Sequence, residues 1–229
     1  MTVRSAMTPP PQQDTQLRKG RLVTDAPTRM FHWLFALSYG GAYITAESEH
    51  WRLLHVCLGY GFAALLAWRL AYGLLGPRQV RLGVLWRKLG NTRRWWTSVR
   101  AEPLLWATHV RQGRLLAMAW SLTLMLGLVI PIVLSGHGAY NEWGGRIGEE
   151  VLEELHEFLA NGFLVLVVVH VGLIIAGSLL GGQNLARPMI SGRLPGEGPS
   201  PVPHNHAAAA GMLLLAWLGL IVWLMRTSS

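Results

Sequence analysis

Two histidines that lie fourteen residues apart are the residues of this sequence whose type and spacing most directly indicate chemistry. His156 and His170 belong to one apolar run, LHEFLANGFLVLVVVHVGLIIAGSLL, and His170 has no charged neighbour in it. Fourteen residues are close to four helical turns, so both rings face one side of a helix, about 21 Å apart along its axis. Ionisable groups inside such runs are costly and tend to be functional. The spacing predicts one nitrogen ligand towards each end of a long helix.

Two further histidines open two other apolar runs. His32 begins one of them and His55 begins another. Neutral imidazole is a common metal ligand, and four histidines at two depths predict a helical bundle that holds two stacked haems. Bis-histidine ligation leaves no open iron position, which favours electron transfer over oxygen chemistry. The remaining histidines lie in loops or at the edges of runs and have the simpler interpretation of interfacial residues: His50, His109, His137, His204 and His206.

The composition indicates that the elements carrying these histidines are membrane helices. Hydrophobic residues make up 51% of the chain, charged residues only 14%, and there are eleven Trp. Five apolar runs are long enough to cross a bilayer, at about 29–46, 54–76, 115–135, 153–180 and 208–225. We therefore expect an all-α integral membrane protein, with a transmembrane four-helix haem-binding bundle and a fifth, C-terminal transmembrane helix.

Four regions are expected along the chain. Residues 1–21 have the composition of a disordered tail, and residues 22–193 form the predicted haem-binding core. Within this core, 76–114 mixes basic residues with Trp86, Trp95, Trp96 and Trp106, which is typical of a segment lying at the membrane interface. Residues 194–207 are a Pro/Gly-rich linker, and 208–229 hold the fifth helix.

Positive charges predict the orientation. Segments 1–29 and 76–114 carry five and nine Lys/Arg, whereas 136–155 carries one Arg against five Glu. Because positive loops stay on the inner side, we expect a multi-pass protein of the bacterial inner membrane with a cytoplasmic N-terminus and a periplasmic C-terminus. The formal charge of +8 then belongs largely to the cytoplasmic face and indicates contact with anionic lipid, and we expect no nucleic-acid partner.

This orientation pairs the histidines by depth. His32 and His170 fall in the cytoplasmic half of their helices, and His55 and His156 fall near the periplasmic ends. Each pair is predicted to bind one haem iron from opposite sides. The haems are expected to be held noncovalently, because the sequence has no Cys-x-x-Cys-His motif.

Two arginines are candidate partners for haem propionates. Arg69 is embedded in LLAWRLAYGLL at about the depth of His170, and a buried Arg needs an anionic partner. The alternative is that Arg69 extends to the cytoplasmic headgroups. Arg29, almost one turn before His32, is the second candidate. Three glycines near the ligand faces, Gly59, Gly61 and Gly162, would let a flat macrocycle approach the backbone, although glycine is also ordinary in the packing of membrane helices.

Three segments carry a family resemblance. DAPTRMFHW at 25–33, LLHVCLGYGFAALLAWRLAYGLLGP at 53–77 and LHEFLANGFLVLVVVHVGLIIAGSLLGGQNLARPMISGR at 155–193 resemble the bacterial cytochrome b561 and nickel–iron-hydrogenase b-type cytochrome superfamily. The resemblance implies a diheme b-type membrane cytochrome whose ligand positions fall on His32, His55, His156 and His170. At THVRQGRLL the chain keeps His109 of a family Gly-His-Asn-Pro motif but lacks its Asn-Pro.

The function expected from these observations is electron transfer between the quinone pool and a periplasmic redox partner, either a c-type cytochrome or a hydrogenase subunit. Two other classes of protein stay open. One is a membrane anchor subunit that recruits a periplasmic enzyme and binds no haem. The other is a proton-coupled transporter that uses the histidines as a relay, although such relays more often include intramembrane carboxylates. Zinc is disfavoured, because its sites gather four ligands at one place.

Overall fold

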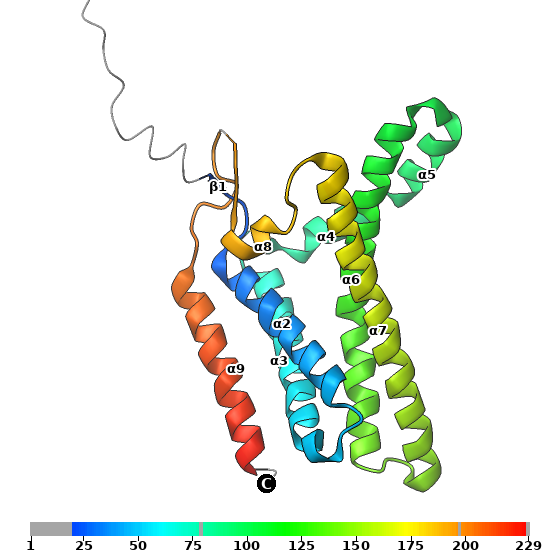
Figure 1. Ribbon diagram of the computed structural model, residues 1–229, viewed down its shortest axis with the longest axis vertical. Helices are drawn as coiled ribbons and strands as arrows, with labels where there is room; N and C mark the ends of the chain where they lie inside the picture. The colour runs from blue at the N-terminus through cyan, green and yellow to red at the C-terminus, as the bar shows by residue number, and fades with distance from the viewer. Residues whose placement is uncertain (1–19, 78–79, 197, 228–229) are drawn as a thin grey trace, which may run out of the picture.

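The computed structural model describes residues 20–77, 80–196 and 198–227. Its architecture is all-α apart from one short strand ladder, as the sequence predicts. Figure 1 shows a long hairpin of α6 (Trp106–Tyr140) and α7 (Gly145–Gly181) beside the pair α2 (Ala26–Thr45) and α3 (Arg52–Leu75). Helix α9 (Ala207–Thr227) packs on α2 and α3, away from the hairpin. The expected tail falls almost wholly on residues 1–19, outside the described residues.

Each of the five predicted apolar runs forms a helix. Among the described residues, four segments are long and apolar enough to cross a membrane: Glu49–Leu75, Pro103–Tyr140, Gly145–Gly181 and Ala207–Thr227. The first predicted span, α2, is a 20-residue helix but is not one of these four. Its sequence, APTRMFHWLFALSYGGAYIT, interleaves polar and small residues with the apolar ones, which lowers its mean hydropathy.

The buried core is made of residues from α2, α3, α6, α7 and α9, with α2 and α3 between α9 and the hairpin. Helices α2 and α3 approach closely at Gly41, where a Cβ atom would lie 2.7 Å from Cδ1 of Leu58. Helix α9 buries one stripe, made of Ala210, Leu213, Trp217 and Ile221. The Trp217 ring rests on Gly61 of α3, and its Nε1 donates a hydrogen bond to Ser38 Oγ of α2 at 3.2 Å. The fifth helix is thus part of the bundle's packing.

One predicted loop is helical instead. The acidic segment within 136–155 was expected to be a connection between spans, but α6 continues to Tyr140 and α7 begins at Gly145. Glu is a good helix former, and carboxylates are favourable near a helix N-terminus, so these residues extend α7. The turn that remains has Glu142 and Gly144 at φ of 52° and 81°.

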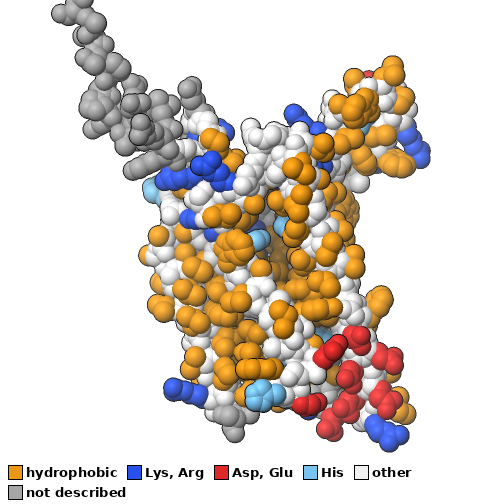
Figure 2. All heavy atoms as spheres, viewed as in Figure 1, with side chains coloured by type: hydrophobic (Ala, Val, Ile, Leu, Met, Phe, Trp, Pro, Cys, Tyr) orange, Lys and Arg blue, Asp and Glu red, His pale blue; other side chains and the backbone are white. Residues whose placement is uncertain are grey.

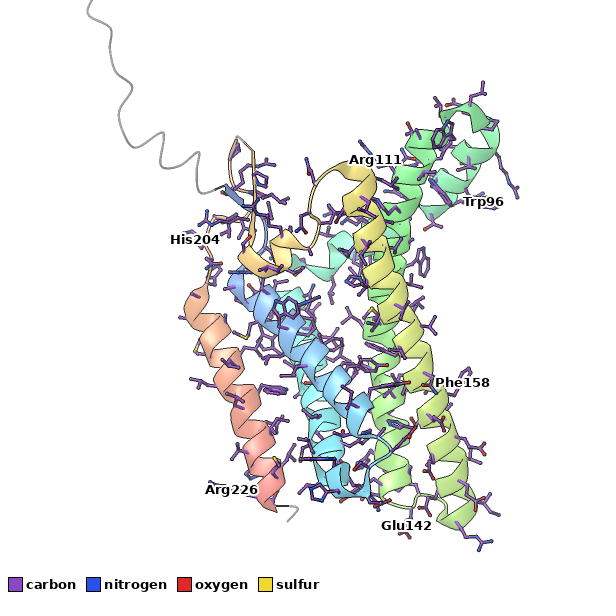
Figure 3. The ribbon with its side chains drawn as sticks, viewed as in Figure 1. Trp96, Arg111, Glu142, Phe158, His204 and Arg226 are labelled. Carbon is purple, nitrogen blue, oxygen red and sulfur yellow. The ribbon has the colours of Figure 1, made fainter. Side chains whose placement is uncertain are left out.

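The two ends of the bundle differ in charge. We call the end with Glu142 and the first turns of α7 the acidic end, and the opposite end, with Arg111 and Trp96, the basic end. Figure 2 shows carboxylates gathered at the acidic end, most Lys and Arg at the basic end, and apolar side chains over the surface between them. In Figure 3, Glu142 and Arg226 mark one end, and Trp96, Arg111 and His204 mark the other.

Short elements complete both ends. At the basic end lie α4 (Leu82–Leu89), α5 (Thr92–Ala101), the 3-10 turn η3 (Pro103–Leu105) and α8 (Arg187–Ser191). There β1 (Arg21–Leu22) pairs antiparallel with β2 (Arg193–Leu194). This pairing joins the two ends of the predicted haem-binding core. At the acidic end, the 3-10 turn η1 (Glu49–Trp51) precedes α3. The sequence did not predict the strand ladder, because two-residue strands have no periodicity to detect.

Candidate functional site

The structure brings His55 and His156 together near the acidic end. His55 comes from α3 and His156 from α7, and their ring centroids lie 5.9 Å apart at an interplanar angle of 77°. Both rings are fixed by backbone carbonyls. Nδ1 of His55 lies 2.8 Å from Ala42 O, and Nδ1 of His156 lies 2.8 Å from Ile132 O.

These hydrogen bonds determine which ring nitrogen is free. A carbonyl oxygen only accepts, so Nδ1 of each ring carries the proton and Nε2 keeps its lone pair. Among the described residues, no hydrogen bond to either Nε2 is found. The same arrangement, with one nitrogen donating to a carbonyl, orients metal-bound histidines. Nε2 is therefore the nitrogen that each of these rings could offer to a metal ion.

His32 and His170 form the second pair, towards the basic end. They come from α2 and α7, are partly buried, and are close enough to interact electrostatically. In the described part of the chain, Nδ1 of each ring is buried without a hydrogen-bond partner. A buried polar atom without a partner is costly, and a ring nitrogen that meets no donor can act as a metal ligand. Figure 2 shows histidine side chains at the border of a hollow in the half of this face nearer the basic end.

Gly136 of α6 makes room for the His156 ring. A Cβ atom at this position would lie 2.8 Å from both Cε1 and Nδ1 of His156.

The three glycines predicted to admit a macrocycle divide into two groups. Cβ atoms at Gly59 and Gly162 would meet no atom within 4 Å, whereas one at Gly61 would meet Trp217 and Ile221 of α9. Gly61 therefore serves helix packing, which is an ordinary role of glycine in membrane helices.

The guanidinium of Arg69 lies at the basic end of α3, near the carboxylate of Asp25, which the sequence did not indicate as its partner. Its Nη2 donates to Val80 O at 3.2 Å, while Nη1 is buried without a partner among the described residues. Asp25 interacts with it electrostatically. Asp25 itself is 1% exposed and accepts hydrogen bonds from Thr28 N at 3.1 Å and from Tyr72 Oη at 2.6 Å. The sequence signal for Asp25 was its N-cap position before Pro27.

Arg29, the second candidate cation, joins α2 to the segments that follow α7. Its Nη1 donates to Ile190 O and its Nη2 to Asn205 Oδ1, both at 3.2 Å. Its Nε is buried without a partner in the described residues. The structure thus gives Arg29 a clear structural role and leaves one of its donors free.

The family model described as prokaryotic cytochrome b561 matches residues 23–192.

The chain belongs to the prokaryotic cytochrome b561 family. This confirms the family predicted from its sequence motifs. No significant match was found among curated proteins or among solved structures. As a member of this family, the protein is a multi-pass b-type membrane cytochrome that binds haem and serves in electron transfer.

The donor set of this cytochrome b561 fits haem. Within the described ranges, no three His, Cys, Asp or Glu side chains gather as a metal site. Imidazoles from two helices lie in contact at His55 and His156, and His32 and His170 lie within electrostatic reach of each other. Paired imidazoles of this kind could hold haem iron. Two other histidines are hydrogen-bonded to other groups. Nε2 of His109 lies 2.9 Å from Glu102 O, and Nδ1 of His137 lies 2.7 Å from Tyr60 Oη.

Proposed function

We propose that this cytochrome b561 holds two haem b groups and transfers electrons between a membrane quinone and a periplasmic redox protein. One haem would be bound by His55 and His156, the other by His32 and His170. The observation that carries the proposal is the acidic-end pair, in which both Nδ1 atoms donate to carbonyls and both Nε2 lone pairs are available. Haem supplies reversible one-electron chemistry at its iron when bound.

The residues of the chain have two tasks in this function. The ring hydrogen bonds from His55 to Ala42 O and from His156 to Ile132 O fix the direction of each Nε2 lone pair before any metal arrives. The two apolar helices that bear them also exclude water, which strengthens every charge interaction inside the bundle.

Arg69 and Arg29 are the proposed partners of the propionates of the haem nearer the basic end. Each has one buried guanidinium nitrogen without a partner among the described residues, Nη1 in Arg69 and Nε in Arg29. A carboxylate on such a donor would gain a charge-assisted hydrogen bond. Asp25 beside Arg69 is a competing anion, so Arg29 is the less encumbered of the two.

We further propose that the basic end faces the cytoplasm and the acidic end the periplasm. The distribution of Lys and Arg along the sequence supports this orientation. The carboxylates of Glu142 and the first turns of α7 would then face a positively charged partner, such as a c-type cytochrome or a hydrogenase subunit. The apolar side chains that cover much of the face between the two ends in Figure 2 support the bilayer as the lateral partner.

Reduction of the oxidised protein by a quinol tests the proposal. Duroquinol is added without oxygen to the purified full-length protein, and the absorbance of reduced b-type haem is recorded. We expect haem reduction by duroquinol and reoxidation by an added basic c-type cytochrome. Haem that dithionite reduces and duroquinol does not would contradict the link to quinone. A protein purified without any haem absorbance would favour the anchor or the transporter.

A further inference from the structure

Four aromatic side chains occupy the level of the bundle between the two histidine pairs. We call Phe35 and Tyr39 of α2, Phe62 of α3 and Phe163 of α7 the aromatic partition. Three of them lie seven residues from a candidate ligand on their own helix: Tyr39 from His32, Phe62 from His55, and Phe163 from both His156 and His170. Seven residues are almost two turns, so each ring shares the face of its histidine, about 10 Å further along the axis.

The rings of the partition are in contact with one another. The Phe163 ring centroid lies 4.4 Å from that of Tyr39, 5.5 Å from Phe62 and 6.3 Å from Phe35. Phe35 and Phe62 lie 4.2 Å apart. These separations are those of favourable tilted and edge-to-face aromatic pairs. Three helices therefore meet through rings at one level.

The phenylalanine rings of the partition are buried, and its one polar side-chain atom has a partner. Phe163 is 1% exposed and Phe62 3% exposed. The hydroxyl of Tyr39 donates to Ala160 O of α7 at 2.9 Å, which ties α2 to α7 next to Phe163. No buried hydroxyl in this cluster is thus left to attract water from either side.

We propose that the aromatic partition separates the two haem sites with a water-free layer and thereby sets the strength of the electrostatic coupling between them. The proposal rests on the two-haem function proposed above. Two charges interact more strongly through a low-dielectric layer than through water. Reduction of one iron therefore changes the affinity of the other for its electron by an amount that depends on this layer.

Ordinary core packing predicts a different consequence of the same contacts. If the rings only fill space, their removal lowers stability and leaves the coupling between the sites unchanged. Redox titration distinguishes the two roles, because it measures the midpoint potential of each haem separately from the stability of the fold.

The experiment measures the coupling as a difference between variants. Substitution of His156 by Ala removes the haem nearer the acidic end, and the resulting shift in the midpoint potential of the remaining haem is the coupling. We expect this shift to become smaller in the Phe163→Ala background, where water enters the gap. In the Phe163→Leu background, where the layer stays apolar, most of the shift should remain.

Phe158→Ala is the matched control. Phe158 lies on the same helix, is 74% exposed and points away from the bundle in Figure 3. It should leave the coupling as in the wild type. If Phe163→Ala loses haem, Phe62→Ala provides the same comparison from α3. If the protein binds two haems and neither Ala variant changes their coupling, the proposed role of the partition is wrong and the two-haem function stands. A wild-type protein with one haem would overturn the two-haem function and the partition together.

Discussion

At the scale of single residues, the glycine at position 136 of α6 leaves the space in which the His156 ring lies. Because a Cβ at position 136 would lie 2.8 Å from two ring atoms of His156, Gly136→Ala should push the ring out of its hydrogen bond with Ile132 O. We expect loss of one of the two haems, measured by haem absorbance per chain. Gly127→Ala is the control, since Gly127 is on the same helix, exposed, with open space at its Cβ position. Full haem content in Gly136→Ala would show that the ring position does not matter for binding.

Arg69 gives a second prediction at this scale. If Arg69 pairs with a propionate, Arg69→Gln removes a positive charge near the haem that lies towards the basic end. The ferric form, which carries one more positive charge than the ferrous form, is then relatively stabilised, so the midpoint potential of that haem should fall. At an effective dielectric constant near 20, the lost interaction between the charges is at most roughly 4 kcal/mol, which is the value for two charges about 4 Å apart. Redox titration measures it. Arg146→Gln, whose side chain is 90% exposed on α7, is the control. An unchanged titration curve in Arg69→Gln would favour extension of Arg69 to the headgroups.

At the scale of elements, the entry of α2 is fixed by Asp25, which caps this helix and also holds α3 through Tyr72. Asp25→Ala removes both hydrogen bonds. The lost cap costs about 1 kcal/mol, and a buried hydroxyl without its partner costs roughly 1–3 kcal/mol more. We expect a lower Tm in detergent, followed by circular dichroism. Asp25→Asn keeps one acceptor oxygen for Thr28 N and offers its NH2 group as a donor to Tyr72 Oη, so it should stay much closer to the wild type. Equal losses in the two variants would mean that the charge of Asp25, rather than its hydrogen bonds, is what matters.

The elements also show what the sequence can predict. Hydropathy and length located all five long helices, because burial in a bilayer demands long apolar runs. His55 lies beside His156, and His32 lies close enough to His170 to interact with it electrostatically. That each of these pairs binds a haem stays a prediction. The extra turns of α7 were missed, since charged residues in a helix that projects beyond the apolar layer resemble a loop. The contacts of Gly136 with His156, of Gly61 with Trp217 and of Asp25 with Tyr72 could not be predicted, because each depends on which helix faces which.

At the scale of the whole molecule, the proposed function places two haem sites between two oppositely charged ends. Haem content per chain, by pyridine haemochrome assay against protein concentration, tests this most directly when it is measured for the wild type and for four single variants. We predict two haems in the wild type and one in each of His32→Ala, His55→Ala, His156→Ala and His170→Ala. Redox titration should show the same component missing in both variants of one pair. One haem or none in the wild type, or the same component missing in His55→Ala and His170→Ala, would contradict the account.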